Sequence, residues 1–181
     1  MNAPPRAPKL LYYEALLCGT PYQKGRWVEI AIHDVRNIHG FFGPYFFLSN
    51  GWRSAVFYRG MYFPSVENAY QAAKFGMDMQ SDFTICSPIE AIEISRQNEA
   101  KIVYTEELWR TLRVDVMRIL IASKFADRIL GKMLIATDKK HLAETNWWGD
   151  YFWGSDEHGN GEDNLGKLLM EHRDLLRKNV P

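Results

Sequence analysis

Four carboxylates of this 181-residue sequence stand beside aromatic, glycine or asparagine residues instead of in charged, solvated stretches: Glu67, Glu144, Asp150 and Asp163. Hydrolysis of a glycosidic bond needs a carboxylate that positions water or stabilises an oxocarbenium-like transition state, and often a second group that protonates the leaving atom. Carboxylates in these surroundings are therefore candidates for chemistry of this kind.

Glu67 lies in the stretch FPSVENAYQAAKF, residues 63–75, where Ser65 is a helix-cap signal and the alanines favour a helix. An acid in the first turn tends to stay ionised, because the helix dipole and the free amides favour negative charge. This suits a base or an electrostatic stabiliser better than an acid. The alternative is that Glu67 only complements the dipole, and the local spacing by itself favours that alternative.

Other candidates also have a purely structural interpretation. Trp109 lies one turn into an amphipathic helix, where core packing is the default for an aromatic residue. Asn50, in FLSNGW, is also an ordinary turn former. Lys74 and Arg96 are either solvated helix residues, which is the favoured interpretation, or contacts to a phosphate. Gly154, like the other glycines near it, most simply marks a turn.

The motifs that carry familiar chemistry are missing from the sequence. There is no GxGxxG, GxxxxGK[ST], GxSxG or HExxH pattern, and the five histidines show no ligand spacing. We therefore expect neither a metal site nor a bound cofactor.

Charge and cysteine content narrow the class of protein. Lys plus Arg number 22, as do Asp plus Glu, so the chain has no global attraction to nucleic acid or acidic membranes. The balanced total does not exclude a local basic patch. Cys18 and Cys86 have no ligand spacing; free thiols in a reducing compartment are favoured over a lone disulfide. Without a secretory segment or a long apolar window, we expect a cytoplasmic protein.

Helical patterns dominate the elements that must position the candidate residues. Period-two alternation predicts a strand at 26–35, and a hairpin is predicted around a turn at Arg59-Gly60. Apolar spacing and cap signals predict helices over 65–76, 87–98, from 105 onward, over 127–136 and over 164–178, with a loop at 137–163. We therefore expect an α+β, mainly α protein with a small N-terminal β element.

Seven segments in order resemble the NADAR family, the YbiA-like group: FFGPYFFLSN, YFPSVENAYQAAKF, SPIEAIEISR, LWRTLRVDVM, SKF, LIATDKKHLAETNWWGDYFWG and GNGEDNLGKLLMEHR. The resemblance covers residues 41–177. It implies a compact helical YbiA-like fold, in which 41–178 form the domain within a single compact unit. Residues 1–40 would be an N-terminal extension, partly frayed, with one strand.

The resemblance also implies an activity. Characterised members of the family look like N-glycosidases: one group cleaves the bond between a ribose phosphate and the aminopyrimidine of early riboflavin intermediates, and another removes ADP-ribose from guanine bases. The family motifs carry catalytic roles onto Glu67, Trp109 and Asp150. In this hypothesis Glu67 and Asp150 flank the anomeric carbon and Trp109 stacks on the base or walls off the ribose. Candidate substrate-binding residues are Asn50, Lys74, Arg96, Glu144, Trp153, Gly154 and Asn164.

The sequence departs from the family pattern in three places. Asn68 stands where the family commonly has His, and Asp163 stands where Asn is usual and adds a negative charge that disfavours a phosphate nearby. Residues 1–40 have no counterpart in shorter members. Asn68 is the departure that we expect to bear most on chemistry or substrate range.

Two classes of function remain at this point. The first is an N-glycosidase acting on a nucleotide-like small molecule or on ADP-ribosylated nucleic acid; zero net charge slightly favours the small molecule. The second is a non-catalytic module that binds ADP-ribose or NAD. Retention of both Glu67 and Asp150 favours the enzyme.

Overall fold

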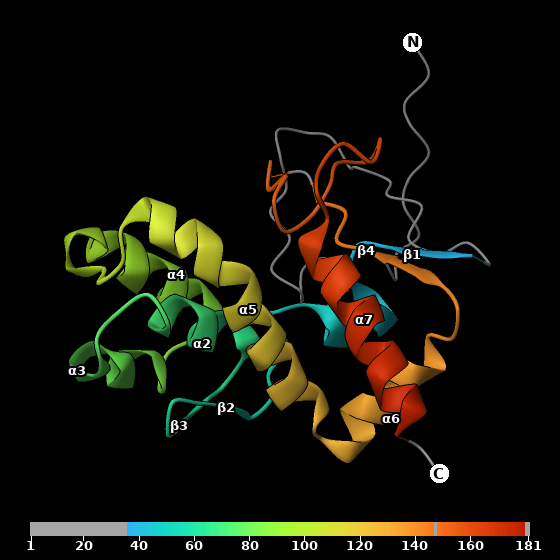
Figure 1. The fold of residues 1–181 in the computed structure, drawn as a ribbon, viewed down its shortest axis with the longest axis horizontal. Helices are drawn as coiled ribbons and strands as arrows, with labels where there is room; N and C mark the ends of the chain where they lie inside the picture. Colours follow the sequence, from blue (N-terminus) through green and yellow to red (C-terminus); the bar gives the residue numbers. More distant parts are fainter. Residues whose placement is uncertain (1–35, 147, 180–181) are drawn as a thin grey trace. The chain divides into compact units, whose positions relative to one another are not determined.

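The computed structural model describes residues 36–146 and 148–179, which form two compact units (Figure 1). We call Asn50–Asp138 together with the residues from Leu168 onward the helical unit. The described residues up to Ser49, together with Lys139–Lys167, form the loop unit. The mainly helical α+β class predicted from sequence is confirmed.

Helix α2, Val66–Ala72, starts at the predicted cap, where the Ser65 hydroxyl accepts a hydrogen bond from the Asn68 N–H at 3.1 Å. The helix ends earlier than the predicted residue 76. Lys74 and Phe75 donate to carbonyls three residues back, so the chain tightens into a turn before Gly76.

Local cap signals set the starts of the other helices in the helical unit. Ser87 and Glu90 form the predicted capping box of α4, Pro88–Gln97. Thr105 caps α5, Glu106–Phe125, and Asp127 caps α6, Arg128–Ala136. The short helix α3, Met77–Gln80, and the 3-10 turns η2, Ser81–Phe83, and η3, Glu99–Lys101, were not predicted.

The predicted hairpin is present. Strands β2, Val56–Tyr58, and β3, Met61–Phe63, pair antiparallel, with Val56 opposite Phe63. Arg59 and Gly60 both have positive φ, 46° and 85°, as a two-residue turn that matches the strand twist requires.

Helix α5 provides the centre of the helical unit. Its buried side chains include Met117, Leu120, Ile121 and Phe125, and the helix packs against α2, β2 and α6, while α2 also packs against α4. Helix α7 spans Asn164–Lys178, and its part from Leu168 onward belongs to this unit. Burial of these apolar faces is the main term that holds the unit together.

The loop unit contains little regular structure. Strand β1, Asn37–His39, pairs in parallel with β4, His141–Ala143, and places fully buried Ile38 opposite Leu142. The 3-10 helix η1 spans Gly43–Leu48. The prediction of an uninterrupted loop over 137–163 is wrong at β4, because three residues carry too short a pattern to signal a strand. The strand predicted at 26–35 lies outside the described residues.

Within the described part of the chain, no helix has both the length and the apolar character that crossing a membrane requires.

Candidate active site

A chain of polar side chains runs along one face of α2. Glu67 Oε1 accepts a hydrogen bond from Gln71 Nε2 at 2.7 Å, and Gln71 Oε1 accepts one from Lys74 Nζ at 2.6 Å. Lys74 Nζ also reaches Ser95 Oγ of α4 at 3.5 Å. Spacings of four and three residues put these groups on the same helical face, so the amide of Gln71 orients an acid and a cation at once.

Asn50 belongs to the same neighbourhood through its backbone. Its carbonyl accepts a hydrogen bond from the Glu67 N–H at 2.9 Å, which attaches the Asn50–Gly51 turn to the first turn of α2. Helix first-turn amides lack partners within the helix, and here the turn supplies one. Asn50 is therefore a turn former that also fixes the backbone of Glu67.

Aromatic rings form the adjoining wall. The half-buried ring of Trp109 lies 5.4 Å from that of Tyr70 and 5.8 Å from that of Tyr104, between centroids. Lys74 Nζ lies 5.5 Å from the Tyr70 ring centroid, and Arg59 donates to the Tyr104 hydroxyl at 2.9 Å. Trp109 therefore packs within an aromatic cluster, and Tyr70 of that cluster lies next to Lys74 of the polar chain on α2.

Burial shifts the pKa of Lys74. Desolvation lowers the pKa of its ammonium, the Glu67 carboxylate opposes that shift, and the Arg96 guanidinium adds to it. Lys74 is partly buried, so the interpretation as a solvated residue is wrong for it, whereas Arg96 is exposed at the end of α4. Glu67 and Lys74 thus form a cation–carboxylate neighbourhood next to aromatic rings.

In the loop unit, the carboxylate of Asp150 is bonded to the backbone. Its Oδ1 accepts hydrogen bonds from the Phe152 N–H at 3.1 Å and the Trp153 N–H at 2.8 Å. Asn146, which sequence reasoning missed, closes the turn before it: its Oδ1 accepts from the N–H groups of Gly149 and Asp150, both at 3.1 Å. One oxygen of Asp150 therefore fixes the shape of the aromatic segment that follows.

The predicted binding residues of the loop unit are built into the same segment. A Cβ at Gly154 would lie 2.2 Å from the Glu144 carbonyl oxygen, so only glycine fits there. Trp153 is buried, and Asn164 Nδ2 donates to the Phe152 carbonyl and to Glu162 Oε2, each at 2.9 Å. These contacts give Gly154 and Asn164 structural roles, and their roles in binding stay predictions.

Asp163 is a buried carboxyl that holds backbone groups. Its Oδ1 accepts from the Glu144 N–H at 2.9 Å, and the Gly166 N–H also bonds to it. Burial raises its pKa to about 6, against the effect of those two amides and of Lys167. Asp163, which stands where the family usually has Asn, therefore directs its carboxylate at backbone N–H groups next to the start of α7.

Asn68, the other departure from the family pattern, is fully buried and faces the loop before α4.

Among the described residues, no group of three or more His, Cys, Asp and Glu side chains is arranged to hold a metal ion.

The structure gathers part of the predicted set in each unit. Asn50, Glu67, Lys74, Arg96 and Trp109 lie in the helical unit, and Glu144, Asp150, Trp153, Gly154 and Asn164 lie in the loop unit. That Glu67 and Asp150 flank one anomeric carbon remains a prediction. The signal that would have revealed Gln71 is its position four residues after Glu67.

Comparison with known proteins identifies the class to which this fold and these residues belong. The family model of the NADAR domain matches residues 33–177, most of the chain. The chain therefore belongs to the NADAR domain family, as its motifs predict.

Relatives in this family carry informative names. The chain is 31% identical over 120 residues to "N-glycosidase YbiA" of Escherichia coli K12, covering 65% of this chain and 72% of YbiA. The solution NMR structure of E. coli YbiA superposes with a TM-score of 0.68 at 27% identity, over 81% of this chain and 89% of that one.

Two longer relatives are named for riboflavin biosynthesis. The protein VVA0006 of Vibrio vulnificus is 31% identical over 136 residues, 75% of this chain. The chloroplastic protein PYRR of Zea mays is 36% identical over 136 residues, 67% of this chain. The matched regions span only 36% and 21% of those two proteins.

Proposed function

We propose that this protein is an N-glycosidase that hydrolyses the C–N bond between the anomeric carbon of a ribose and a nitrogenous base. The observation that carries the proposal is the Glu67–Gln71–Lys74 chain beside the Tyr70 and Trp109 rings. It combines an oriented carboxylate, a cation and aromatic surface, the groups that such a substrate requires. Membership of a family whose relatives include named N-glycosidases supports it.

Glu67 is the group best suited to activate water. In the first turn of α2 its carboxylate is favoured in the ionised form, and Gln71 holds one of its oxygens. As the C–N bond breaks, the bond electrons leave with the base nitrogen. Water then adds its oxygen to the anomeric carbon while Glu67 takes the proton, which passes on to the departing nitrogen, so that ribose and free base are the products.

The other candidate residues take supporting roles in this proposal. Asp150 stabilises the positive charge that develops on the ribose or helps the nitrogen to leave, and Trp109 stacks on the base or walls off the ribose. Lys74 and Arg96 contact a phosphate of the substrate, while Asn50 contacts the ribose. Glu144, Trp153, Gly154 and Asn164 complete the binding surface.

Two substrates fit the proposal at a finer level: a ribosylamino-pyrimidine phosphate of the riboflavin route, and a guanine base that carries ADP-ribose. The names of VVA0006 and PYRR support the first. Zero net charge also favours a nucleotide-like small molecule over long nucleic acid. We propose that the protein acts on a nucleotide-like small molecule in the cytoplasm.

The test is a parallel assay of the purified protein on ADP-ribosylated guanine DNA, a riboflavin-pathway ribosylamino-pyrimidine phosphate and NAD, with release of free base followed by chromatography. We expect turnover of one of the first two substrates. Glu67→Gln should lower it by about 10²–10⁴-fold, the usual contribution of general acid–base catalysis. Glu107→Gln, an acid in the first turn of α5, is the matched control and should leave turnover unchanged.

Two results would overturn this function. ADP-ribose or NAD binding without base release from any substrate would indicate a non-catalytic binding module. Wild-type turnover by a folded Glu67→Gln protein would remove Glu67 from the mechanism.

A further inference from the structure

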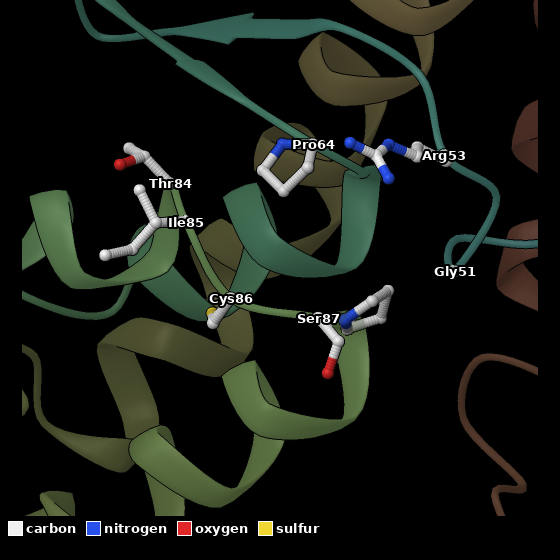
Figure 2. A pocket seen from close by; sticks show the side chains of 8 residues that line it. Gly51, Arg53, Pro64, Thr84, Ile85, Cys86 and Ser87 are labelled. Carbon is white, nitrogen blue, oxygen red and sulfur yellow. The ribbon is translucent and has the colours of Figure 1, made fainter.

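A cavity of about 440 Å³ lies within the helical unit, at the start of α2 and α4. Figure 2 shows Arg53 and Pro64 on one side of it and the 84–87 segment on the other. Its size is in the range of about 300–1,000 Å³ typical of small-molecule sites. Its wall includes Gly51, and the carbonyl of the preceding Asn50 accepts a hydrogen bond from the Glu67 N–H, so this turn links the cavity wall to the first turn of α2.

The lining suits a flat heteroaromatic ring better than a phosphate. Pro88 offers no N–H at the start of α4, and the Ser87 N–H is already bonded to Glu90 Oε2 at 2.7 Å, so this helix start presents a carboxylate. Burial is the main cause that raises the pKa of the Cys86 thiol, and the nearby Glu90 and Asp82 carboxylates add to it, so acidic side chains lie close to this wall. A phosphate at this end of the cavity would meet the Glu90 carboxylate, which disfavours it there.

The remaining groups complement a neutral ring with carbonyl acceptors. Arg53 lines the cavity with a planar guanidinium. Arginine stacks on rings and donates two hydrogen bonds at once, for example to O6 and N7 of guanine in DNA. Pro64 adds apolar surface, and Ile85 is 91% exposed on the rim, an apolar side chain that a bound ring would cover. Ser87 Oγ accepts from the Glu90 N–H at 3.3 Å and keeps its proton for a ligand, whereas the Thr84 hydroxyl already donates to the Ser81 carbonyl at 2.7 Å.

Asn68 sets the position of the wall that faces Arg53. Its Nδ2 donates to the carbonyls of Phe83 at 3.0 Å and Cys86 at 2.9 Å, and its Oδ1 accepts from Ser65 Oγ at 2.6 Å. The side chain is fully buried and adjacent in sequence to Glu67. A carboxamide meets all three partners because it has two N–H donors and an acceptor, which neither a carboxylate nor a neutral imidazole provides.

We propose that this cavity receives the heteroaromatic leaving group of the N-glycoside, and that Asn68 is the positioning residue that holds its 83–86 wall against the helix bearing Glu67. The proposal rests on the N-glycosidase function for the identity of the ligand. The cavity and its clamp stand on the contacts alone and are tested without turnover.

Cys86 is a reporter inside the cavity. Its Sγ lies 3.3 Å from Asn68 Nδ2, and burial raises the pKa of its thiol, which lowers the fraction of thiolate that iodoacetamide modifies. With Cys18 replaced by Ser in every protein, the rate of iodoacetamide modification of Cys86 is measured by mass spectrometry. Asn68→Asp keeps the acceptor for Ser65 but loses both donors, so modification should be about tenfold faster or more, as expected when an opening equilibrium loses two buried hydrogen bonds.

Asn98→Asp is the matched control. It removes an Asn amide that donates to the Ile94 carbonyl at 2.9 Å, at the other end of α4, and should leave the Cys86 rate unchanged. Equal rates in Asn68→Asp and the unsubstituted protein would overturn the role of Asn68.

Ligand protection tests the occupant. Guanosine or 6-aminouracil, each added at twice its own Kd, should slow Cys86 modification about threefold, because a competing ligand lowers the rate by the factor 1 + [L]/Kd. Ribose 5-phosphate should give no protection. Arg53→Ala should weaken protection by the bases. Protection by ribose 5-phosphate would overturn the proposal, as would protection by none of the three compounds at millimolar concentration. This experiment does not need Asn68→Asp, so it tests the proposal even if that variant does not fold.

The two proposals fail separately. Protection by a base without turnover of any glycoside would refute the enzymatic function and leave the base site. Turnover together with an unprotected Cys86 would refute the base site and leave the function.

Discussion

The candidate carboxylates of the two units are held in different ways. In the helical unit, Glu67, Gln71 and Lys74 are bonded to one another. In the loop unit, the carboxylates of Asp150 and Asp163 are bonded to backbone N–H groups. A regular helix satisfies its own backbone and leaves side chains available to one another, whereas an irregular segment needs side chains to satisfy its backbone.

This difference teaches that a carboxylate beside aromatic and glycine residues has two distinct uses. Glu67 is held by a side chain, so its substitution is expected to change chemistry more than stability. Asp150 and Asp163 support the backbone, so their substitution is expected to change stability even where chemistry is also lost.

Lys124 gives the largest expected effect in the helical unit. Burial lowers the pKa of this fully buried lysine to about 7 from 10.5. The unfolded state then holds more protons than the folded state between those values, so the contribution of Lys124 to stability rises with pH above 7. Relative to Lys124→Met, the wild-type free energy of unfolding should rise by about 4 kcal/mol between pH 6 and pH 10.

Urea denaturation at several pH values measures this difference. Lys132→Met, on an exposed position of α6, is the control and should give parallel curves. Parallel curves for Lys124→Met as well would show that Lys124 keeps an ordinary pKa.

Asp163 gives the corresponding effect in the loop unit, with the opposite sign. Its folded pKa, about 6, lies above the ordinary 3.8, so its contribution to stability is present below pH 4 and is lost as pH rises to about 6. Relative to Asp163→Asn, the wild type should lose about 2 kcal/mol of unfolding free energy between pH 4 and pH 7. Asp78→Asn, an exposed acid, is the control; a flat difference for Asp163→Asn would contradict the prediction.

Asp150 and Glu67 sharpen the comparison directly. Asp150→Ala removes the acceptor of two backbone N–H groups and should lower the unfolding free energy by about 1 kcal/mol, or the melting temperature by about 2–4 °C, whereas Asp150→Asn retains most of that stability. Glu67→Ala removes one hydrogen bond to a side chain and should lower stability less than Asp150→Ala does. Thermal denaturation decides, and a larger loss for Glu67→Ala would reverse the comparison.

Gln71 gives the smallest expected effect. Gln71→Leu removes the amide that links Glu67 to Lys74, and should lower kcat about five- to tenfold with little change in KM, because one orienting hydrogen bond is worth about 1 kcal/mol. Steady-state kinetics on the substrate found in the assay measure it. An unchanged kcat would show that the chain of side chains does not orient Glu67.

Helix starts were predictable from sequence because their causes are local. Ser87 with Glu90, Thr105 and Ser65 act over three or four residues, and the structure has helices starting at each. Strand β4 was not predictable, because its partner β1 is about a hundred residues away and its three residues carry no period. The candidate site divides in the same way: Glu67 and Lys74 follow from helical spacing, whereas Asn146 becomes visible only in the folded loop.

By itself, the sequence determined the family, the mainly helical class and the residues with which to begin, because motif order and cap signals are written in adjacent residues. Only the tertiary structure decided what those residues touch. It placed Lys74 in a partly buried position, bonded Asp150 to two backbone amides and turned Asn68 toward the 83–86 loop. Burial and hydrogen bonding depend on segments distant in sequence, and they fix the charge and the orientation of a side chain.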